Sequence, residues 1–388
     1  MKKFLSILMI IVTVIGMLSG CSSTTETSKS AKSEDEVVTV ELDESAYVTA
    51  DGDVLTADLE ALVQDAITKN YPDESETATT EIDLSKESDV VNIRNGGTYV
   101  LTGEFDGQIF VDTDDEDVQL ILAGVTLTND DDAPIYIMSA DEATITLKSG
   151  TTNTIVNTSV YMEDDGTDVE RANGAIYSKA DLAINGDGSL EIVANNKTAI
   201  LGKDDVVILS GHIKVSSERN GIKGKDLLYI GDVDLEIESG KAGLNSEVVV
   251  YIDGSEININ DSYEGIESYD IMIKDGLVNI VASDDGINIA NPDESSSMGG
   301  GFGMPGSNGQ TSTHGLRIYG GSVNINSNGD GLDSNASIWM TGGLVTVSGP
   351  TSNGNGSLDY DQTFTLDGGI LIAVGSLGMV QTPSDTSS

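Results

Sequence analysis

The sequence has few of the residues on which many active sites and small scaffolds depend. Its 388 residues include one cysteine, two histidines, six prolines and only 5% aromatic side chains. The single cysteine, Cys21, excludes disulfides within the chain and metal sites built from several thiolates. The only histidines are His212 and His314, and His314 adjoins a Gly/Ser-rich stretch, so we find no support for a Ser-His-Asp triad.

Basic residues are also scarce. The chain has 19 Lys and Arg against 65 Asp and Glu, which gives a formal net charge of −46. Such a surface repels phosphate, so we expect no nucleic-acid partner, whereas divalent cations are attracted. The charge balance therefore favours a metal ion as cofactor.

A long apolar run is missing as well, except at the amino terminus. Residues 1–21 begin with two lysines, continue through the apolar run 4–18 and end in Leu-Ser-Gly-Cys. This run is too short for a stable membrane span and is typical of an export signal. The last four residues resemble a bacterial lipobox, which implies that Cys21 carries a lipid.

Residues 22–46 are mostly Ser, Thr, Glu and Lys, and predict a flexible tether. No second apolar run is long enough to cross a bilayer, so the lipid is the only membrane attachment that we expect. The sequence thus predicts an extracytoplasmic, lipid-anchored protein at the cell surface.

A short pattern repeats through the second half of the chain: one residue, then Gly, then Ile or Leu. Gly221, Gly243, Gly265 and Gly286 are 22, 22 and 21 residues apart, and a longer step leads to Gly331. Looser copies occur at residues 173–175 and 355–357. So regular a period indicates a solenoid.

Each repeat holds short runs of alternating apolar residues separated by Gly, Asp or Asn, which indicates strands and turns. Stacked coils of about 22 residues, each with three strands, bury their apolar side chains one strand spacing of about 4.8 Å apart. A β-propeller needs about 40 residues per blade, and the leucine-rich consensus is missing. We predict an all-β, right-handed parallel β-helix over 81–382, with one buried line of inward residues: Ile222, Leu244, Ile266, Ile287 and Leu332.

The ends and loops are less regular. Residues 56–69 have helical spacing and predict an amino-terminal cap within 47–80. Residues 157–172 predict an acidic loop, and residues 291–313 predict an exposed Gly/Ser/Met-rich insertion. Residues 383–388 form a polar tail with no obvious carboxy-terminal cap.

Four segments together resemble a family of bacterial surface carbohydrate-binding proteins with a polysaccharide-lyase-like right-handed parallel β-helix. The segments are 178–186 (Ser-Lys-Ala-Asp-Leu-Ala-Ile-Asn-Gly), 220–225 (Asn-Gly-Ile-Lys-Gly-Lys), 284–288 (Asp-Asp-Gly-Ile-Asn) and 354–361 (Gly-Asn-Gly-Ser-Leu-Asp-Tyr-Asp). The resemblance covers roughly 80–382. One departure is Ala180, where the family has a second polar residue. The resemblance implies binding of cellulose and acidic sugars, and bound calcium.

Stacked coils align equivalent residues in columns. The residue before each repeat glycine and the residue two positions after it give two columns rich in Asp, Glu and Asn. Carboxylates one coil apart repel by about 3–4 kcal/mol at an effective dielectric near 20, so such columns need protons or cations. Oxygen ligands at staggered heights suit calcium. The alternative is solvated corner residues. The candidate metal ligands are Glu264, Glu267, Asp284, Asp285, Asn288, Asp330 and Asp333.

A further column faces outward on the following strand: Tyr229, Tyr251, Met272, Arg317 and Trp339. Its flat side chains offer a stacking surface for sugar rings, with Arg317 available to a uronate carboxylate. Ordinary cross-strand packing remains an equal alternative, because a register slip of one residue reverses the face. The predicted carbohydrate-binding residues are Tyr229, Tyr251, Arg317 and Trp339.

Lyase chemistry requires a base that removes the proton α to a calcium-bound uronate carboxyl group. The only basic cluster near the acidic columns consists of Arg219, Lys223, Lys225 and Lys241. Charge balance on an acidic surface explains the same cluster. We therefore predict a non-catalytic binding protein for cellulose or a uronate-containing polysaccharide, assisted by calcium. A calcium-dependent polysaccharide lyase and a rod-like surface adhesin stay open as alternatives.

Overall fold

The computed structural model describes residues 56–69, 71–160, 172–290 and 314–384. The expected export signal with Cys21, the tether 22–46 and the insertion 291–313 lie outside these residues. Among the described helices, none is both long enough and apolar enough to cross a bilayer.

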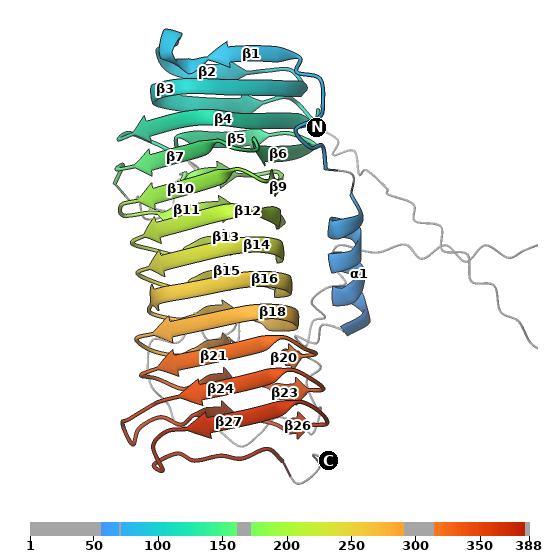
Figure 1. The fold of residues 1–388 in the computed structure, drawn as a ribbon, viewed down its shortest axis with the longest axis vertical. Helices are drawn as coiled ribbons and strands as arrows, with labels where there is room; N and C mark the ends of the chain where they lie inside the picture. The colour runs from blue at the N-terminus through green and yellow to red at the C-terminus, as the bar shows by residue number, and fades with distance from the viewer. Residues whose placement is uncertain (1–55, 70, 161–171, 291–313, 385–388) are drawn as a thin grey trace, which may run out of the picture. The chain divides into compact units, whose positions relative to one another are not determined.

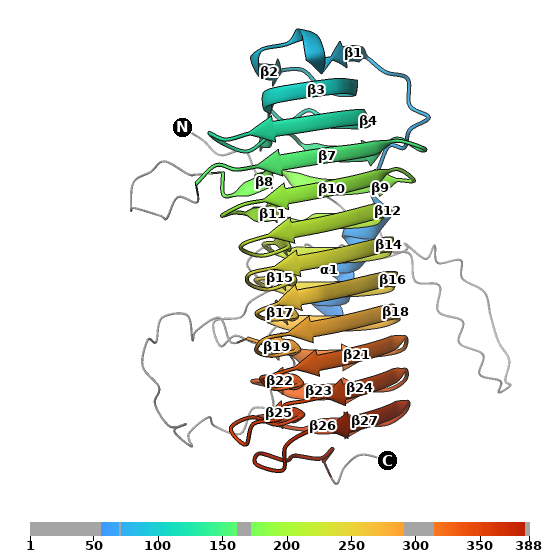
Figure 2. The same cartoon turned by 60° about the vertical axis from the view of Figure 1, so that its left-hand side comes forward.

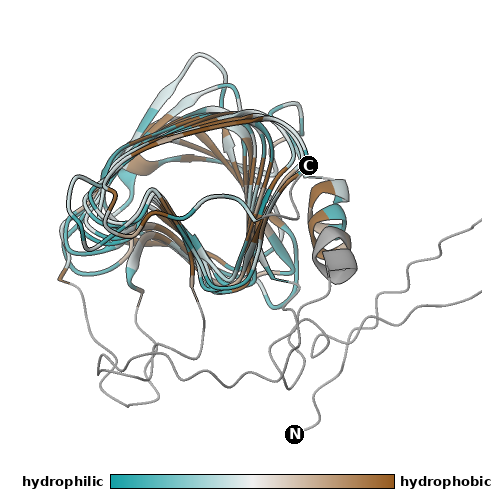
Figure 3. Cartoon of the chain, turned by 90° about the horizontal axis from the view of Figure 1, so that it is seen from below, coloured by the Kyte–Doolittle hydropathy of each residue, from teal (hydrophilic) through white to brown (hydrophobic). Residues whose placement is uncertain are grey.

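The described strands stack in parallel as one solenoid, as predicted (Figure 1). The chain descends from β1 to β27 while the nearest strands run from right to left, which is a right-handed coil. Seen along the axis, the coils superimpose, so equivalent residues form columns (Figure 3). We name the three sides of the coil faces 1, 2 and 3.

Face 3 is the shortest, and its strands follow the repeat glycines. Its strands are β2 (Asp89–Ile93), the end of β3 (Gly97–Asp112), β5 (Ile135–Ser139), β8 (Gly174–Ser178), β11 (Thr198–Gly202), β13 (Ile222–Gly224), β15 (Leu244–Ser246), β17 (Ile266–Ser268), β19 (Ile287–Ile289), β22 (Leu332–Ser334) and β25 (Leu358–Tyr360).

Faces 1 and 2 are joined by strands that bend in the middle. Those passing through both faces are β3, β4 (Val118–Asn129), β12 (Val206–Ser217), β14 (Leu227–Ser239), β16 (Val249–Ser262) and β18 (Asp270–Ala282). Face 1 also has β1 (Thr80–Asp83), β6 (Glu142–Leu147), β9 (Asp181–Gly186), β20 (Gly315–Ile318), β23 (Ser337–Met340) and β26 (Phe364–Leu366). Face 2 also has β7 (Thr152–Asn157), β10 (Ser189–Ala194), β21 (Ser322–Ser327), β24 (Leu344–Ser348) and β27 (Ile370–Val374).

The predicted buried line is present and is longer than the five residues expected. Ile222, Leu244, Ile266, Ile287 and Leu332 are aligned pairwise, and each is fully buried. The line extends to Leu358 at one end and, at the other end, through Ile200, Ile176, Ile135 and Ile109 to Val91. Face 3 therefore packs inward through a continuous column of aliphatic side chains.

The repeat glycines are required by close packing of adjacent coils. A Cβ added at Gly265 would lie 2.2 Å from the carbonyl oxygen of Gly286 and 2.4 Å from Ile280 Cγ2. Gly286 is crowded in the same way by Gly331 and Ile325. Any side chain here would push the coils apart at the corner, which explains the strict spacing in the sequence.

The two looser copies of the repeat are shifted by one residue. Ile176 and Leu358 occupy the buried line, so Ala175 and Ser357 take the place of the repeat glycine. Gly174 and Gly356 therefore precede the glycine column. In these two copies the buried aliphatic residue keeps its place in the column, whereas the glycine lies one residue earlier.

The helix predicted over 56–69 is present as α1 (Thr56–Thr68), but it lies along the side of the coils (Figures 2 and 3). It contacts β14, and Lys69 Nζ lies 2.6 Å from Asp181 Oδ2 of β9. In the first coil, η1 (Leu84–Lys86) connects β1 to β2 and contacts β3, and its Leu84 is fully buried. Val63 and Ala66 of α1 are buried as well, so the helix packs its apolar residues in its position beside the coils.

The last coil is closed by the segment that follows β27. The backbone N–H of Ser384 donates to the carbonyl of Phe364 at 2.9 Å, and the hydroxyl of Tyr360 donates to the carbonyl of Thr382 at 2.6 Å. Phe364 is fully buried as a result. A carboxy-terminal cap therefore exists, although its polar sequence gave no sign of it.

Candidate functional site

A polar groove of about 990 Å³ runs along the outer side of face 3. The residue after each buried aliphatic residue points outward, which produces the predicted column Lys223, Asn245, Glu267, Asn288 and Asp333. All five line the groove. Cationic and anionic side chains follow one another along this column, so the groove has a basic part and an acidic part.

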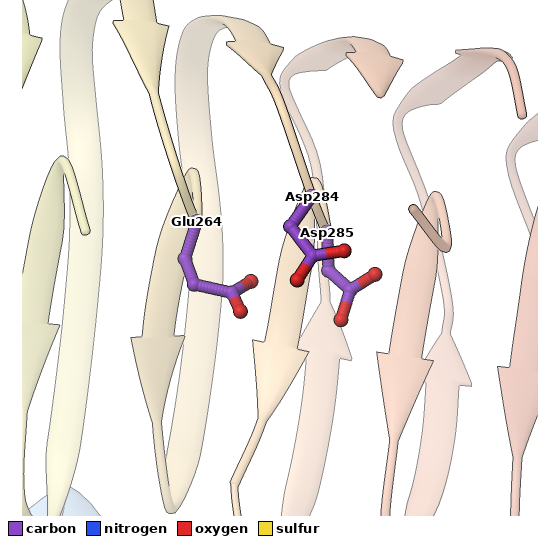
Figure 4. A group of neighbouring side chains, drawn as sticks. All are labelled: Glu264, Asp284 and Asp285. Atoms are coloured by element: carbon purple, nitrogen blue, oxygen red, sulfur yellow. The ribbon is translucent and has the colours of Figure 1, made fainter. Parts of the chain in front are cut away.

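Two groups of carboxylates that share one residue adjoin the acidic part of the groove, which Glu264 and Asp333 line. Glu264, Asp284 and Asp285 form the first group (Figure 4). Asp285, Asp330 and Asp333 form the second, and in each group the oxygens lie within 4.8 Å of one another. Glu264, Asp285 and Asp330 each precede a repeat glycine and form one column at the corner of the coils. Their coils are in register, since the N–H of Gly265 donates to the carbonyl of Asp285, and the N–H of Gly286 donates to that of Asp330. Stacking of identical corners thus brings the carboxylates together.

Burial makes this concentration of negative charge unfavourable. Burial, and then the charges of Asp285 and Asp284, raise the pKa of Glu264 to about 8. Burial, and then the charges of Asp285 and Asp330, raise the pKa of Asp333 to about 8. Either protons or a cation must compensate for the repulsion near neutral pH.

The donor atoms fit a hard cation. Glu264 Oε2 and Asn288 Oδ1 are buried and have no hydrogen-bond partner. Carboxylate and amide oxygens are the ligands that calcium prefers, and six to eight are needed. The remaining ligands would be water or backbone carbonyls. Glu267 belongs to neither group, because its Oε2 accepts a hydrogen bond from Asn245 Nδ2 at 3.0 Å.

The basic part of the groove holds three of the four predicted cations. Arg219, Lys223 and Lys241 line the groove, whereas Lys225 lines a neighbouring pocket of about 200 Å³. Lys223 Nζ lies 3.0 Å from Glu247 Oε1. Burial, and then the charge of Arg219, lower the pKa of Lys241. Three cations converge here in a chain with a net charge of −46, which is a suitable environment for an anionic ligand.

The aromatic column on face 1 has the predicted register but not the predicted exposure. Tyr229 and Tyr251 stack with ring centroids 5.8 Å apart, and the Arg317 guanidinium lies 4.6 Å from the centre of the Trp339 ring. Tyr229, Tyr251 and Arg317 are only 7%, 8% and 6% exposed. Sugar stacking on this column stays a prediction, and it requires the residues around these side chains to move.

Arg317 has a partner inside the protein that the sequence did not reveal. Its NH1 forms an ion pair with Asp270, whose carboxylate is fully buried. The two residues are 47 positions apart and are brought together by the pairing of β18 with β20. This contact gives Arg317 a structural role, independent of any uronate.

Three residues near the groove were missed by sequence reasoning. Asp359 extends the outward column beyond Asp333, and it was missed because its repeat is shifted by one residue. Tyr263 and Tyr269 line the groove, and Tyr269 stacks on His314 at 4.0 Å. Both tyrosines flank the face 3 strand β17. In the sequence, only their positions next to Glu264 and Ser268 indicate that they lie near the groove.

Comparisons with known proteins identify the family of this chain. A sequence model for the family described as "Carbohydrate-binding domain-containing protein" matches residues 87–357. A curated relative with the same description, from Acetivibrio thermocellus, is 38% identical over 136 residues, which are 34% of this chain and 47% of the relative. The chain thus spans about half the length of that relative.

A solved structure also matches, that of the polysaccharide lyase-like protein from C. thermocellum in its gadolinium derivative. The two chains are 24% identical, with a TM-score of 0.38, and the match covers 76% of this chain and 89% of that chain.

Proposed function

Because the chain belongs to the family of carbohydrate-binding domain-containing proteins, we propose that it is a non-catalytic cell-surface lipoprotein that binds a uronate-containing polysaccharide in the face 3 groove. Calcium held by the acidic part would assist binding. The lipid on Cys21 would keep the solenoid at the membrane. Cellulose is the neutral alternative ligand.

One observation carries this proposal: three cations line the same groove as Glu264 and Asp333, which belong to the two carboxylate groups. Lys241 and Arg219 present positive charge to a uronate carboxylate, and a cation bound by either carboxylate group would attract another. A polysaccharide with repeated carboxylates can pair with the basic part and with the bound cation at the same time. A neutral glucan has no charge to pair with either.

The ligand preference is tested by retention on insoluble polygalacturonate and on cellulose, with calcium and with a chelator. We expect calcium-dependent retention on polygalacturonate that Lys241→Met weakens. The matched control is Lys214→Met, since Lys214 is an exposed lysine on face 2 that lies 3.7 Å from Glu236. Retention on neither glycan would favour the alternative function of a rod-like surface adhesin, because that function depends on the rigid solenoid and not on glycan binding.

The same panel separates the groove from the aromatic column. We expect Tyr251→Ala and Trp339→Ala to retain polygalacturonate, because these residues lie on face 1 and outside the groove. Loss of retention in these two variants, with normal retention by Lys241→Met, would place the glycan on face 1 instead.

A lyase is the second candidate function, and the lowered pKa of Lys241 favours it. In its neutral form, the Lys241 amine would take the proton α to the carboxyl group. The electron pair would form the C4–C5 double bond of an unsaturated uronate as the glycosidic C–O bond breaks, and the leaving oxygen would take a proton from water. A cation held by the carboxylate groups would supply charge stabilisation to the uronate carboxylate. The absorbance of that product, measured on soluble polygalacturonate with calcium, tests this alternative. No rise in absorbance while the glycan is bound supports a binding protein.

A further inference from the structure

The last coil differs from the coils before it in the residues that point outward on face 2. One outward column is polar in six successive coils and becomes apolar only in β27. It comprises Lys214, Glu236, Asn258, Asn279, Asn324, Thr346 and finally Ile372. Ile372 is 51% exposed, and its neighbours Ile370 and Val374 are 60% and 67% exposed.

The polar side chains of this column form hydrogen bonds with one another from coil to coil. Asn279 Nδ2 donates to Asn258 Oδ1 at 2.8 Å, and Asn324 Nδ2 donates to Asn279 Oδ1 at 3.0 Å. The Thr346 hydroxyl donates to Asn324 Oδ1 at 2.7 Å. Ile372 follows Thr346 and cannot continue this series, so its outward position has a different explanation.

The strand that carries these residues has an unpaired edge. β27 pairs with β24 on one side, and no other described strand pairs with it. Proteins usually protect such an edge with charged residues, proline or a covering segment. Residues 368–384 contain no charged residue, and β27 contains no proline.

The segment that follows β27 covers part of the last coil. The segment after β27 already crosses the end of the solenoid and buries Phe364, through the hydrogen bonds of Ser384 and Thr382. The exposed apolar side chains at this end belong to β27 and to the segment after it, in which Leu377, Met379 and Val380 are 83%, 45% and 61% exposed. Within this surface, β27 is the part that also has an unpaired strand edge among the described residues.

We propose that β27 pairs with β27 of a second copy of this chain, antiparallel about a two-fold axis centred on Ile372. This pairing supplies hydrogen bonds to the edge and places Ile370 opposite the partner's Val374. The net charge of −46 opposes contact elsewhere, whereas residues 368–384 are neutral and allow two copies to approach. A bilayer is a poorer occupant, because lipid offers no backbone partners and anionic headgroups repel the chain.

Sedimentation of the full chain carrying Cys21→Ser, over a range of concentrations, tests the proposal. We expect a monomer–dimer equilibrium. Ile372→Asp places two carboxylates opposite each other and should weaken the dimer at least about tenfold. Thr346→Asp, in the same column but one coil away from the edge, should leave it unchanged. Circular dichroism of each variant verifies that the solenoid is folded.

Two further measurements address the register. An equimolar mixture of Ile372→Asp and Ile372→Lys should dimerise more tightly than either variant alone, because position 372 faces itself. With Cys21 replaced, Ile372→Cys introduces the only thiol and should form a covalent dimer on oxidation, whereas Thr346→Cys should not. A monomer at all concentrations, a dimer insensitive to Ile372→Asp, or growth beyond a dimer would overturn the proposal. Binding of the monomer to anionic vesicles would assign the surface to lipid.

Discussion

Asp285 Oδ1 accepts a hydrogen bond from the backbone N–H of Asp330, one coil further along the solenoid. Asp330 Oδ1 in turn accepts from the backbone N–H of Gly356. Asp285 and Asp330 thus each use one oxygen to join their own coil to the next. The other oxygen is available to the acidic groups that Asp285 shares, so a bound cation and the stacking of coils depend on the same residues.

We predict that calcium raises the melting temperature and that Asp285→Ala together with Asp330→Ala removes most of the increment. A ligand at 100 times its dissociation constant stabilises the folded state by about 2.7 kcal/mol. Thermal melts of chelated and calcium-loaded protein measure the difference. An unchanged melting temperature on adding calcium would contradict the metal site.

Asp285→Asn separates the metal from the hydrogen bond. The amide oxygen still accepts from Asp330, but the negative charge is lost, so we expect near-normal stability in chelator and a reduced calcium increment. Asp234→Asn is the control, because Asp234 is half exposed on face 2 and pairs with His212. If both variants respond alike to calcium, the carboxylates of the corner do not bind it.

The columns of this solenoid follow directly from the sequence. The interval between glycines determines which residues stack. Ile222 is therefore aligned with Leu244, and Lys223 is aligned with Asn245, as the repeat predicts. A strand also alternates its faces, which assigns the inward and outward residues. The repeat thus predicts the fold and the groove column together.

What lies over a column does not follow from the repeat. Tyr229 and Tyr251 face outward as predicted, but a segment outside the repeat contacts β14 and the rings are almost fully buried. The ion pair of Arg317 with Asp270 joins adjacent strands, but the two residues are not in the same column, because Arg317 is aligned with Met272. The period predicts which residues are aligned, and it gives no signal for contacts between columns or with segments outside the repeat.

We predict that Ile266→Ala lowers the free energy of unfolding by about 2–5 kcal/mol, because it leaves a cavity between Leu244 and Ile287. Val281→Ala is the matched control: Val281 is 43% exposed in the adjacent strand and should matter little. Urea unfolding measures both variants. Equal losses would mean that the aliphatic column does not carry the core of face 3.

Arg317→Met should destabilise the protein by about 3–5 kcal/mol, because the buried Asp270 carboxylate loses its counter-charge. Adding Asp270→Asn should recover part of the loss, since no buried charge remains. Urea unfolding of the two variants gives the comparison. We expect the folded Arg317→Met variant to retain polygalacturonate normally. Normal stability combined with lost retention would instead show that Arg317 binds the uronate.

The final prediction concerns pH. Burial, and then the charges of Asp181 and Asp204, raise the pKa of Asp205 to about 8, against about 4 in an unfolded chain. The folded state therefore holds this proton more tightly, and the stability it contributes is complete below about pH 4 and is lost as pH rises through 8. Thermal melts in chelator should show a falling melting temperature between pH 5 and pH 8.5. Asp205→Asn should reduce this slope, whereas Asp234→Asn should not; identical slopes would exclude Asp205 as its source.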